Sequence, residues 1–262
     1  MQKRTAYCEN PICSLAVLSV MGDRTDQQDD FGYMLDDERS LIIVCDGMGG
    51  HEGGRLASNA AVNRFILQYK SAPKNYEIIP FLEECTALAN ADVLNLKTAS
   101  GEKLNAGSTL VAVMLDSSRN LYWNSVGDSR LYLFRDGDFA QITQDHNYTT
   151  VLLEKLNAGM IDREEFNSEN LKGEALISFL GISGSPLVDY NHLPLPLLPG
   201  DRLVIMSDGL YKVLPDADIL NIVNNFSNVN ETAMALEIKA EKTATKNGIS
   251  RDNTTIAVLK IK

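Results

Sequence analysis

The chain lacks long hydrophobic runs and has few cysteines. None of its apolar stretches approaches the roughly 18 residues that a membrane span needs, and residues 1–8 hold no hydrophobic signal core. We therefore expect a cytoplasmic protein with no membrane partner. Of its four cysteines, Cys45 and Cys85 lie in apolar stretches and are expected to be buried thiols. Cys8 and Cys13 have no second pair to complete a four-ligand zinc site, so a metal or regulatory disulfide there is the minor alternative.

Basic residues are also in short supply. Lysine and arginine total 24 against 35 aspartates and glutamates, which gives a net charge of −11. This balance argues against nucleic acid as a partner, because such binders present a basic face. It is compatible with phosphorylated substrates, since bound divalent cations can reverse the local field. Repeats, low-complexity tracts and Pro/Ser-rich linkers are lacking too, so we expect residues 1–262 to form one domain.

Hydrophobic patterning predicts both strands and helices. Apolar runs of strand length occupy residues 15–20, 30–35, 41–45, 108–115, 121–126, 130–135, 139–142, 201–206 and 254–261. Helical periodicity covers residues 54–69, 76–97, 215–225 and 232–246. The segment 134–139 reads as a hairpin with an Asp-Gly turn. Two helices follow the early strands and two more precede the last strand. This order predicts an α+β fold with sheets in the middle and helix pairs outside.

Four short acidic motifs stand beside these strands. Asp46 and Asp208 each follow an apolar run and precede a glycine, Asp128 follows Gly127, and Asp252 precedes the last strand. An aspartate on a tight turn at a strand end presents a hard oxygen ligand, which suits Mg²⁺ or Mn²⁺. Any one Asp-Gly pair is more simply a hairpin turn. The four together favour a metal centre built from distant parts of the chain.

The flanks of these motifs carry a family resemblance. In order along the chain they are Arg24-Thr-Asp-Gln-Gln-Asp29, Asp46-Gly-Met-Gly-Gly50, Gly54-Arg-Leu-Ala-Ser58, Ala106-Gly-Ser-Thr109, Gly127-Asp-Ser-Arg-Leu-Tyr132, Thr143-Gln-Asp-His146, Leu180-Gly181, Asp208-Gly-Leu210 and Asp252-Asn-Thr-Thr255. The ordered set resembles the metal-dependent serine/threonine protein phosphatases, the PPM or type 2C family, in their compact bacterial form. The resemblance implies a four-layer α-β-β-α sandwich: a central antiparallel β-sandwich flanked by helix pairs.

The resemblance also implies a site. Two Mg²⁺ or Mn²⁺ ions would share Asp46, the carbonyl of Gly47 would ligate one of them, and Asp208 and Asp252 would complete the other. Asp128 would serve a third, weaker metal that some bacterial relatives bind. A hydroxide generated at the two ions would attack the phosphate in line.

Residues 24–29 both match the family and depart from it. Arg24 stands in the position of a phosphate-binding arginine, so we expect a catalytic and substrate-binding role; a surface arginine is the alternative. Many relatives have Glu before the aspartate that matches Asp29, but this chain has Gln28. We expect weaker metal affinity there, because one negative charge is lost. Asp29 is expected to ligate a metal directly or to support a ligand.

Two further features bear on proton transfer and substrate contact. Met48 stands where animal relatives have a histidine that protonates the leaving group, so metal-bound water is the expected donor. His51, His146 and His192 are the other acid-base candidates, with His146 expected to tether a turn. Residues 158–185 match a flap over the substrate cleft, but lack the Thr-Arg pair that relatives commonly carry before Leu180-Gly181.

The leading hypothesis is a protein-serine/threonine phosphatase, expected to be a monomer, that acts on proteins phosphorylated by a Ser/Thr kinase. One alternative is a pseudophosphatase that binds phosphoproteins without cleaving them. The intact aspartate set argues against it. The other is a different two-metal phosphoester hydrolase, such as a phosphodiesterase or a nuclease, which the acidic composition disfavours.

Overall fold

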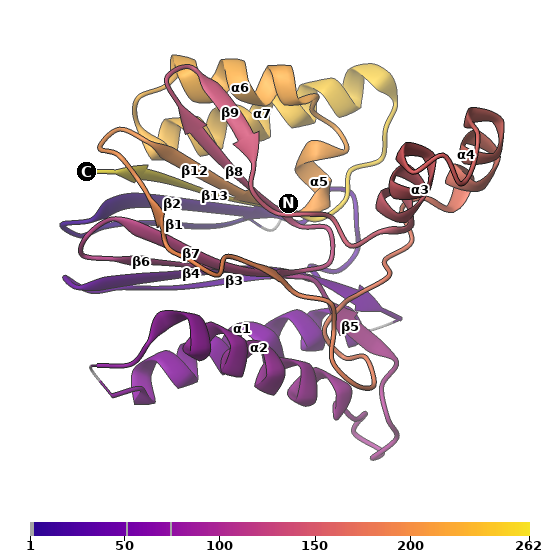
Figure 1. Cartoon of the computed structure of the whole chain (residues 1–262), viewed down its shortest axis with the longest axis horizontal. Coiled ribbons are helices and arrows are strands. Elements are labelled where there is room, and N and C mark those ends of the chain that lie inside the picture. The colour runs from indigo at the N-terminus through magenta and orange to yellow at the C-terminus, as the bar shows by residue number, and fades with distance from the viewer. Residues whose placement is uncertain (1–2, 51, 74) are drawn as a thin grey trace.

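Two antiparallel sheets are stacked at the centre of the molecule (Figure 1). A computed structural model describes residues 3–50, 52–73 and 75–262. In spatial order, the first sheet contains β1 (Lys3–Glu9), β2 (Cys13–Val20), β13 (Thr254–Ile261), β12 (Arg202–Met206), β8 (Arg130–Arg135) and β9 (Asp138–Gln141). The second sheet contains β10 (Asp189–Tyr190), β7 (Asn120–Val126), β6 (Leu110–Asp116), β4 (Arg39–Gly49) and β3 (Asp29–Leu35). Beside that path, β11 (Leu195–Pro196) pairs with β7 and β5 (Ala106–Ser108) pairs with β4.

Helix pairs cover the outer faces of both sheets. The second sheet is covered by α1 (Gly53–Ser71) and α2 (Ile78–Leu94), and the first by α6 (Asp216–Asn225) and α7 (Val229–Asn247) (Figure 1). A short helix, α5 (Asp208–Tyr211), follows β12 directly. At one end of the stack, α3 (Tyr148–Asn157), α4 (Arg163–Glu169) and a 3₁₀ turn (Asn170–Lys172) project away from the layers. The predicted α+β, four-layer architecture is confirmed.

The strands read as continuous apolar runs because both of their faces are buried. In β4, Leu41 and Ile43 pack against α1 and α2, whereas Ile42 and Val44 pack against the first sheet. Alternate residues of a strand point to opposite faces, so one strand supplies two of the three apolar layers. Fully burying one such side chain stabilises the fold by about 1.5–3 kcal/mol.

Several boundaries differ from the sequence prediction. β4 continues to Gly49, four residues beyond the expected end at Cys45. The expected strand 108–115 is two strands, β5 and β6, interrupted at Thr109. β1 was not predicted; its residues are mostly exposed at a sheet edge, so they show no apolar run.

Other local expectations are confirmed. The turn between β8 and β9 has Asp136 at φ 53° and Gly137 at φ 84°, as a two-residue hairpin requires. Cys45 and Cys85 are buried free thiols, and Cys8 and Cys13 are also unpaired. None of the helices in the described ranges is long and apolar enough to cross a bilayer.

Candidate active site

A cavity of about 370 Å³ brings together side chains that are far apart in the sequence. Its lining includes Arg24, Gln28, Asp46, Gly47, Met48, Gly49, Thr109, Asp128, Glu174, Leu176, Asp208, Lys212, Asp252 and Asn253. Of the predicted metal ligands and the predicted phosphate-binding arginine, Asp29 alone is not part of this lining. Both sheets contribute to it, because Asp46 belongs to the second sheet and Asp208 and Asp252 adjoin strands of the first.

Asp46 is held rigidly inside β4. Its amide N–H donates to Thr109 Oγ1 at 2.9 Å, and its carbonyl accepts from Thr109 N at 2.8 Å and from Ser108 Oγ at 3.1 Å. Asp46 therefore lies in a strand that continues past it, and the predicted tight turn at this position was wrong. Burial, followed by the charges of Asp29 and Asp208, raises the pKa of the Asp46 carboxyl well above its usual range.

Gly47 is required by close packing rather than by a turn. A Cβ atom at this position would lie 2.0 Å from the carbonyl oxygen of Gly54 and 2.7 Å from that of Gln28. Gly209 shows the same pattern, since a Cβ there would lie 2.1 Å from the carbonyl oxygen of Asn253. In both Asp-Gly pairs the glycine lets a second backbone segment approach the aspartate.

Asp208 begins α5 directly after Ser207, at the end of β12. Its Oδ2 atom forms an ion pair with Lys212 Nζ at 2.8 Å, one helical turn later. Its Oδ1 atom is buried and has no hydrogen-bond partner among the described residues. A buried carboxylate oxygen without a donor is costly, and a cation would offset that cost.

Asp252 lies in the loop before β13. Its Oδ1 atom accepts from the Asn253 N–H at 2.7 Å, and its Oδ2 atom forms an ion pair with the guanidinium of Arg24 at 2.5 Å. Arg24 is 60% exposed, so it stands at the rim of the cavity. The Asn253 side chain ties the loop that carries Arg24 to this place, because it donates to the carbonyls of Met21 and Asp26.

Asp29 lies behind the cavity wall, opposite Asp46 in the β3–β4 pairing. Its Oδ2 atom accepts from Ser207 Oγ at 2.8 Å, and its Oδ1 atom is buried without a partner among the described residues. Burial, with the charges of Asp208 and Asp252, raises the pKa of Asp29 to about 7, although hydroxyl donors oppose this. The structure thus surrounds the cavity with more buried negative charge than its local partners neutralise.

Asp128 occupies the turn between β7 and β8 and is 5% exposed. Burial and the charge of Asp208 raise the pKa of its carboxyl to about 6. Asp128 lines the cavity of about 370 Å³ described above, the candidate catalytic cavity, and also a second, larger cavity beside it. From this position the Asp128 carboxylate can add negative charge at the edge of a metal centre.

The donor set fits hard divalent cations, which take carboxylate and carbonyl oxygens. The orphaned Oδ1 atoms of Asp29 and Asp208 and the raised pKa of Asp46 are the observations that support the fit. Within the described ranges, no three acidic, histidine or cysteine side chains already form a closed ligand group. Asp208 and Asp252 instead turn to Lys212 and Arg24. Which oxygens ligate a metal stays a prediction.

Neither of the two histidines that the structure describes, His146 and His192, lines this cavity. The Nδ1 atom of His146 accepts a hydrogen bond from the Gly127 N–H, and the backbone N–H of His146 donates to the Gly127 carbonyl. This confirms that it tethers the turn that carries Asp128. Burial lowers the pKa of His146. His192 packs on the ring of Tyr190 outside the cavity, and His51 lies outside the described residues.

Comparison with known proteins decides the family. A sequence model described as protein phosphatase 2C matches residues 21–242. The chain belongs to the protein phosphatase 2C family. This confirms the resemblance drawn from the ordered motifs.

Bacterial members of the protein phosphatase 2C family are similar to the chain over most of its length. The serine/threonine phosphatase stp of Listeria innocua serovar 6a is 29% identical over 217 residues, 82% of this chain and 83% of that protein. The fold resembles that of the Streptococcus agalactiae serine/threonine phosphatase, with a TM-score of 0.81, 24% identity and coverage of 95% and 100% of the two chains. The catalytic domain of the phosphatase PstP in complex with two manganese ions has a TM-score of 0.75, 25% identity and coverage of 95% and 98%.

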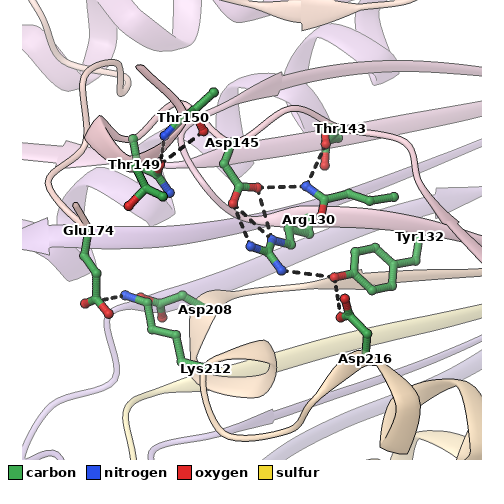
Figure 2. Close-up of polar contacts among 12 residues, drawn as sticks. Arg130, Tyr132, Thr143, Asp145, Thr149, Thr150, Glu174, Asp208, Lys212 and Asp216 are labelled. Carbon is green, nitrogen blue, oxygen red and sulfur yellow. Dashed lines mark hydrogen bonds and ion pairs between the residues drawn. The ribbon is translucent and has the colours of Figure 1, made fainter. Parts of the chain in front are cut away.

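Beside the predicted centre of this protein phosphatase 2C chain lies a second cavity of about 710 Å³. Figure 2 shows its polar wall, where Arg130 pairs with Asp145 and donates to Tyr132. The two cavities share Asp128, Glu174 and Lys212. Glu174 comes from the segment after α4, so the predicted flap does border the site. It also begins earlier than expected, since the projecting part starts with α3 at Tyr148.

The sequence reasoning missed Lys212 and Glu174. Lys212 stands four residues after Asp208, a spacing that places oppositely charged side chains together on a helix. That signal was present in the sequence. Glu174 had no comparable signal, because its contact with Lys212 spans 38 residues and depends on how the flap folds back.

Proposed function

We propose that this chain hydrolyses phosphoserine and phosphothreonine in proteins with the help of two Mg²⁺ or Mn²⁺ ions. The observation that supports the proposal is the shared cavity, in which Asp46, Asp208 and Asp252 meet Arg24. The chain's serine/threonine phosphatase relatives, and the manganese complex of PstP, agree with it.

The residues divide into those that hold ions and those that hold substrate. Asp46, the Gly47 carbonyl, Asp208 and Asp252 would hold the two ions, which when bound neutralise the phosphate and lower the pKa of a water. Asp128 would serve a third ion. We propose a supporting role for Asp29, because its Oδ2 atom is already committed to Ser207.

Arg24 would bind the phosphate. Its planar fork can donate two hydrogen bonds to phosphate oxygens, and its place at the rim leaves it accessible to substrate. Its present partner, Asp252, would turn to a metal, which releases the guanidinium for the substrate.

The proposal extends to the setting of the enzyme. We propose a cytoplasmic monomer, with residues 1–262 as one catalytic domain, that reverses the action of a Ser/Thr kinase. Nucleic acid is not a proposed partner, because the net charge is −11.

The test is phosphate release from a phosphothreonine peptide. We expect release with Mn²⁺ or Mg²⁺, loss with EDTA and recovery when metal is restored. Asp208→Asn should abolish release, whereas Asp218→Asn, on α6 and paired with Lys239, should act like the parent. Peptide binding without cleavage would show a pseudophosphatase, and cleavage of a nucleotide diester alone would show a different hydrolase.

A further inference from the structure

Lys212 lies where the two cavities meet. Its Nζ atom is 2.8 Å from Asp208 Oδ2 and 3.1 Å from Glu174 Oε2, so one ammonium group bridges α5 and the flap (Figure 2). Its side chain lines the catalytic cavity and the larger cavity beside it. If a substrate placed its phosphorylated side chain in the catalytic cavity and its polypeptide chain in the larger cavity, the substrate would lie against this ammonium group.

Positive charge is scarce around the catalytic cavity. Arg24 and Lys212 are the cationic side chains among the described residues that line it. Arg130 lines only the larger cavity, where Asp145, Tyr132 and the ring of Tyr211 hold its guanidinium. The segment 176–181 of the flap contributes no basic residue.

The two ion pairs that Lys212 forms can break when a metal and a substrate bind. Asp208 is a proposed metal ligand, and a cation bound to it would repel the ammonium group. The Glu174 side chain is 79% exposed, and a surface ion pair of this kind contributes little. A phosphate dianion held by two metal ions would be a stronger partner for the ammonium group than either carboxylate.

We propose that Lys212 binds the substrate phosphoryl group together with Arg24. This inference rests on the proposed function and adds a second phosphate-binding cation to it. Lys212, directly after α5, thereby supplies positive charge that segment 176–181 of the flap lacks.

The experiment measures binding of inorganic phosphate to the Mn²⁺-loaded protein by titration calorimetry, with Mn²⁺ affinity measured separately. Lys212→Met keeps most of the side-chain volume and removes the charge. We expect it to weaken phosphate binding about ten- to a hundredfold, as loss of one charged hydrogen-bonding group does, without weakening Mn²⁺ binding. Lys212→Arg should restore most of the affinity. Lys239→Met, which breaks an ion pair on α6 and α7, is the matched control and should bind phosphate like the parent.

Two outcomes would overturn the inference. In the first, Lys212→Met binds phosphate within about twofold of the parent, or loses phosphate affinity only in proportion to a loss of Mn²⁺ affinity. Either result would mean that Lys212 pairs with Asp208 and does not contact the phosphate. Glu174→Gln removes a competing partner and should bind phosphate at least as tightly as the parent. In the second, Glu174→Gln binds phosphate more weakly than the parent, which would mean that Lys212 affects phosphate binding through its ion pair with Glu174 of the flap.

Kinetics supply an independent readout. Lys212→Met should raise KM for a small aryl phosphate as well as for a phosphopeptide, because both carry the phosphoryl group. An effect on the phosphopeptide alone would place Lys212 on the polypeptide and refute the contact. A parent that binds Mn²⁺ and phosphate but cleaves no phosphothreonine peptide would refute the proposed function, while the calorimetric test of Lys212 would still stand.

Discussion

Single side chains at the cavity have separable roles because each has a different partner. Gln28 lines the cavity, and its amide donates to the Gly49 carbonyl at 3.4 Å. Its backbone is fixed on both sides, since its N–H donates to Asn253 Oδ1 and its carbonyl accepts from Gly47 N. A substitution at Gln28 can therefore change the charge of the side chain while the backbone stays in place.

Replacing Gln28 by Glu should strengthen metal binding. A carboxylate adds one negative charge to the cavity, and ligand charge tunes cation affinity. We expect Gln28→Glu to lower the Mn²⁺ concentration needed for half-maximal phosphatase activity, measured by metal titration of the EDTA-treated enzyme. An unchanged or higher requirement would show that the existing aspartates already saturate this position.

In the function that we propose, Arg24 binds the substrate rather than the metal. Arg24→Ala should raise KM for a phosphopeptide by about tenfold, since a charged hydrogen bond to phosphate is lost. Arg24→Lys should recover only part, because a point charge lacks the planar fork. The Mn²⁺ requirement should not increase. Cleavage by Arg24→Ala that matches the parent would make Arg24 a surface residue.

At the scale of elements, the Asp-Gly pairs show how the chain delivers carboxylates. The end of β4 lies against the start of α1, and the start of α5 lies against the loop before β13. Both approaches are too close for a Cβ atom. Helices and strands thus meet backbone to backbone beside each aspartate.

Gly47→Ala should therefore disturb both stability and the metal site. Its Cβ atom would force the start of α1 away from β4, at a cost of about 1–3 kcal/mol, and we expect weaker Mn²⁺ binding as well. Gly50→Ala is the matched control, because a Cβ atom there meets nothing within 4 Å. Urea unfolding and calorimetry would measure both effects. Equal behaviour of the two variants would contradict the packing argument.

Sequence patterns predicted the buried elements well and the exposed ones poorly. The sequence predicts β4, β6 and β13 as apolar runs because both faces of these strands are buried. β1 is mostly exposed, so no hydrophobic signal marks it. In the flap, α4 has an aspartate cap at Asp162 that accepts from Glu165 N, a capping signal that was present but overlooked.

The candidate site was predictable as a set of residues but not as a geometry. The ordered motifs named Asp46, Asp208, Asp252 and Arg24, and all four line one cavity. That Asp46 lies within a strand, and that Glu174 reaches the site, depends on contacts between distant segments. Local sequence does not encode such pairings.

At the scale of the whole molecule, the buried carboxylates link stability to pH. Burial raises the pKa of Asp29 to about 7 and that of Asp128 to about 6, both above the values of an unfolded chain. Between the unfolded-chain pKa of an aspartate, about 3.9, and these raised values, the folded protein still holds protons that the unfolded chain has released. Stability of the metal-free protein should therefore fall as pH rises through this range.

Thermal unfolding in EDTA at about pH 5.5 and about pH 7.5 would measure this dependence. We expect the higher Tm at the lower pH. Mn²⁺ should stabilise more at the higher pH, because more of the carboxylates around the cavity are then ionised and attract the cation. Asp29→Asn should show a smaller dependence on pH. A metal-free Tm that increases toward pH 7.5 would contradict the assigned charges.

The place of β13 in the first sheet has a consequence for protein synthesis. β13 is the last strand of the chain, yet it lies in the interior of the sheet, between β2 and β12. Asp252 stands just before it. A ribosome must therefore translate through residue 261 before the first sheet can close and before the cavity gains its fourth aspartate. A nascent chain that has already folded α1, α2 and the second sheet would still be catalytically silent, so activity would begin only when translation of the strand is finished.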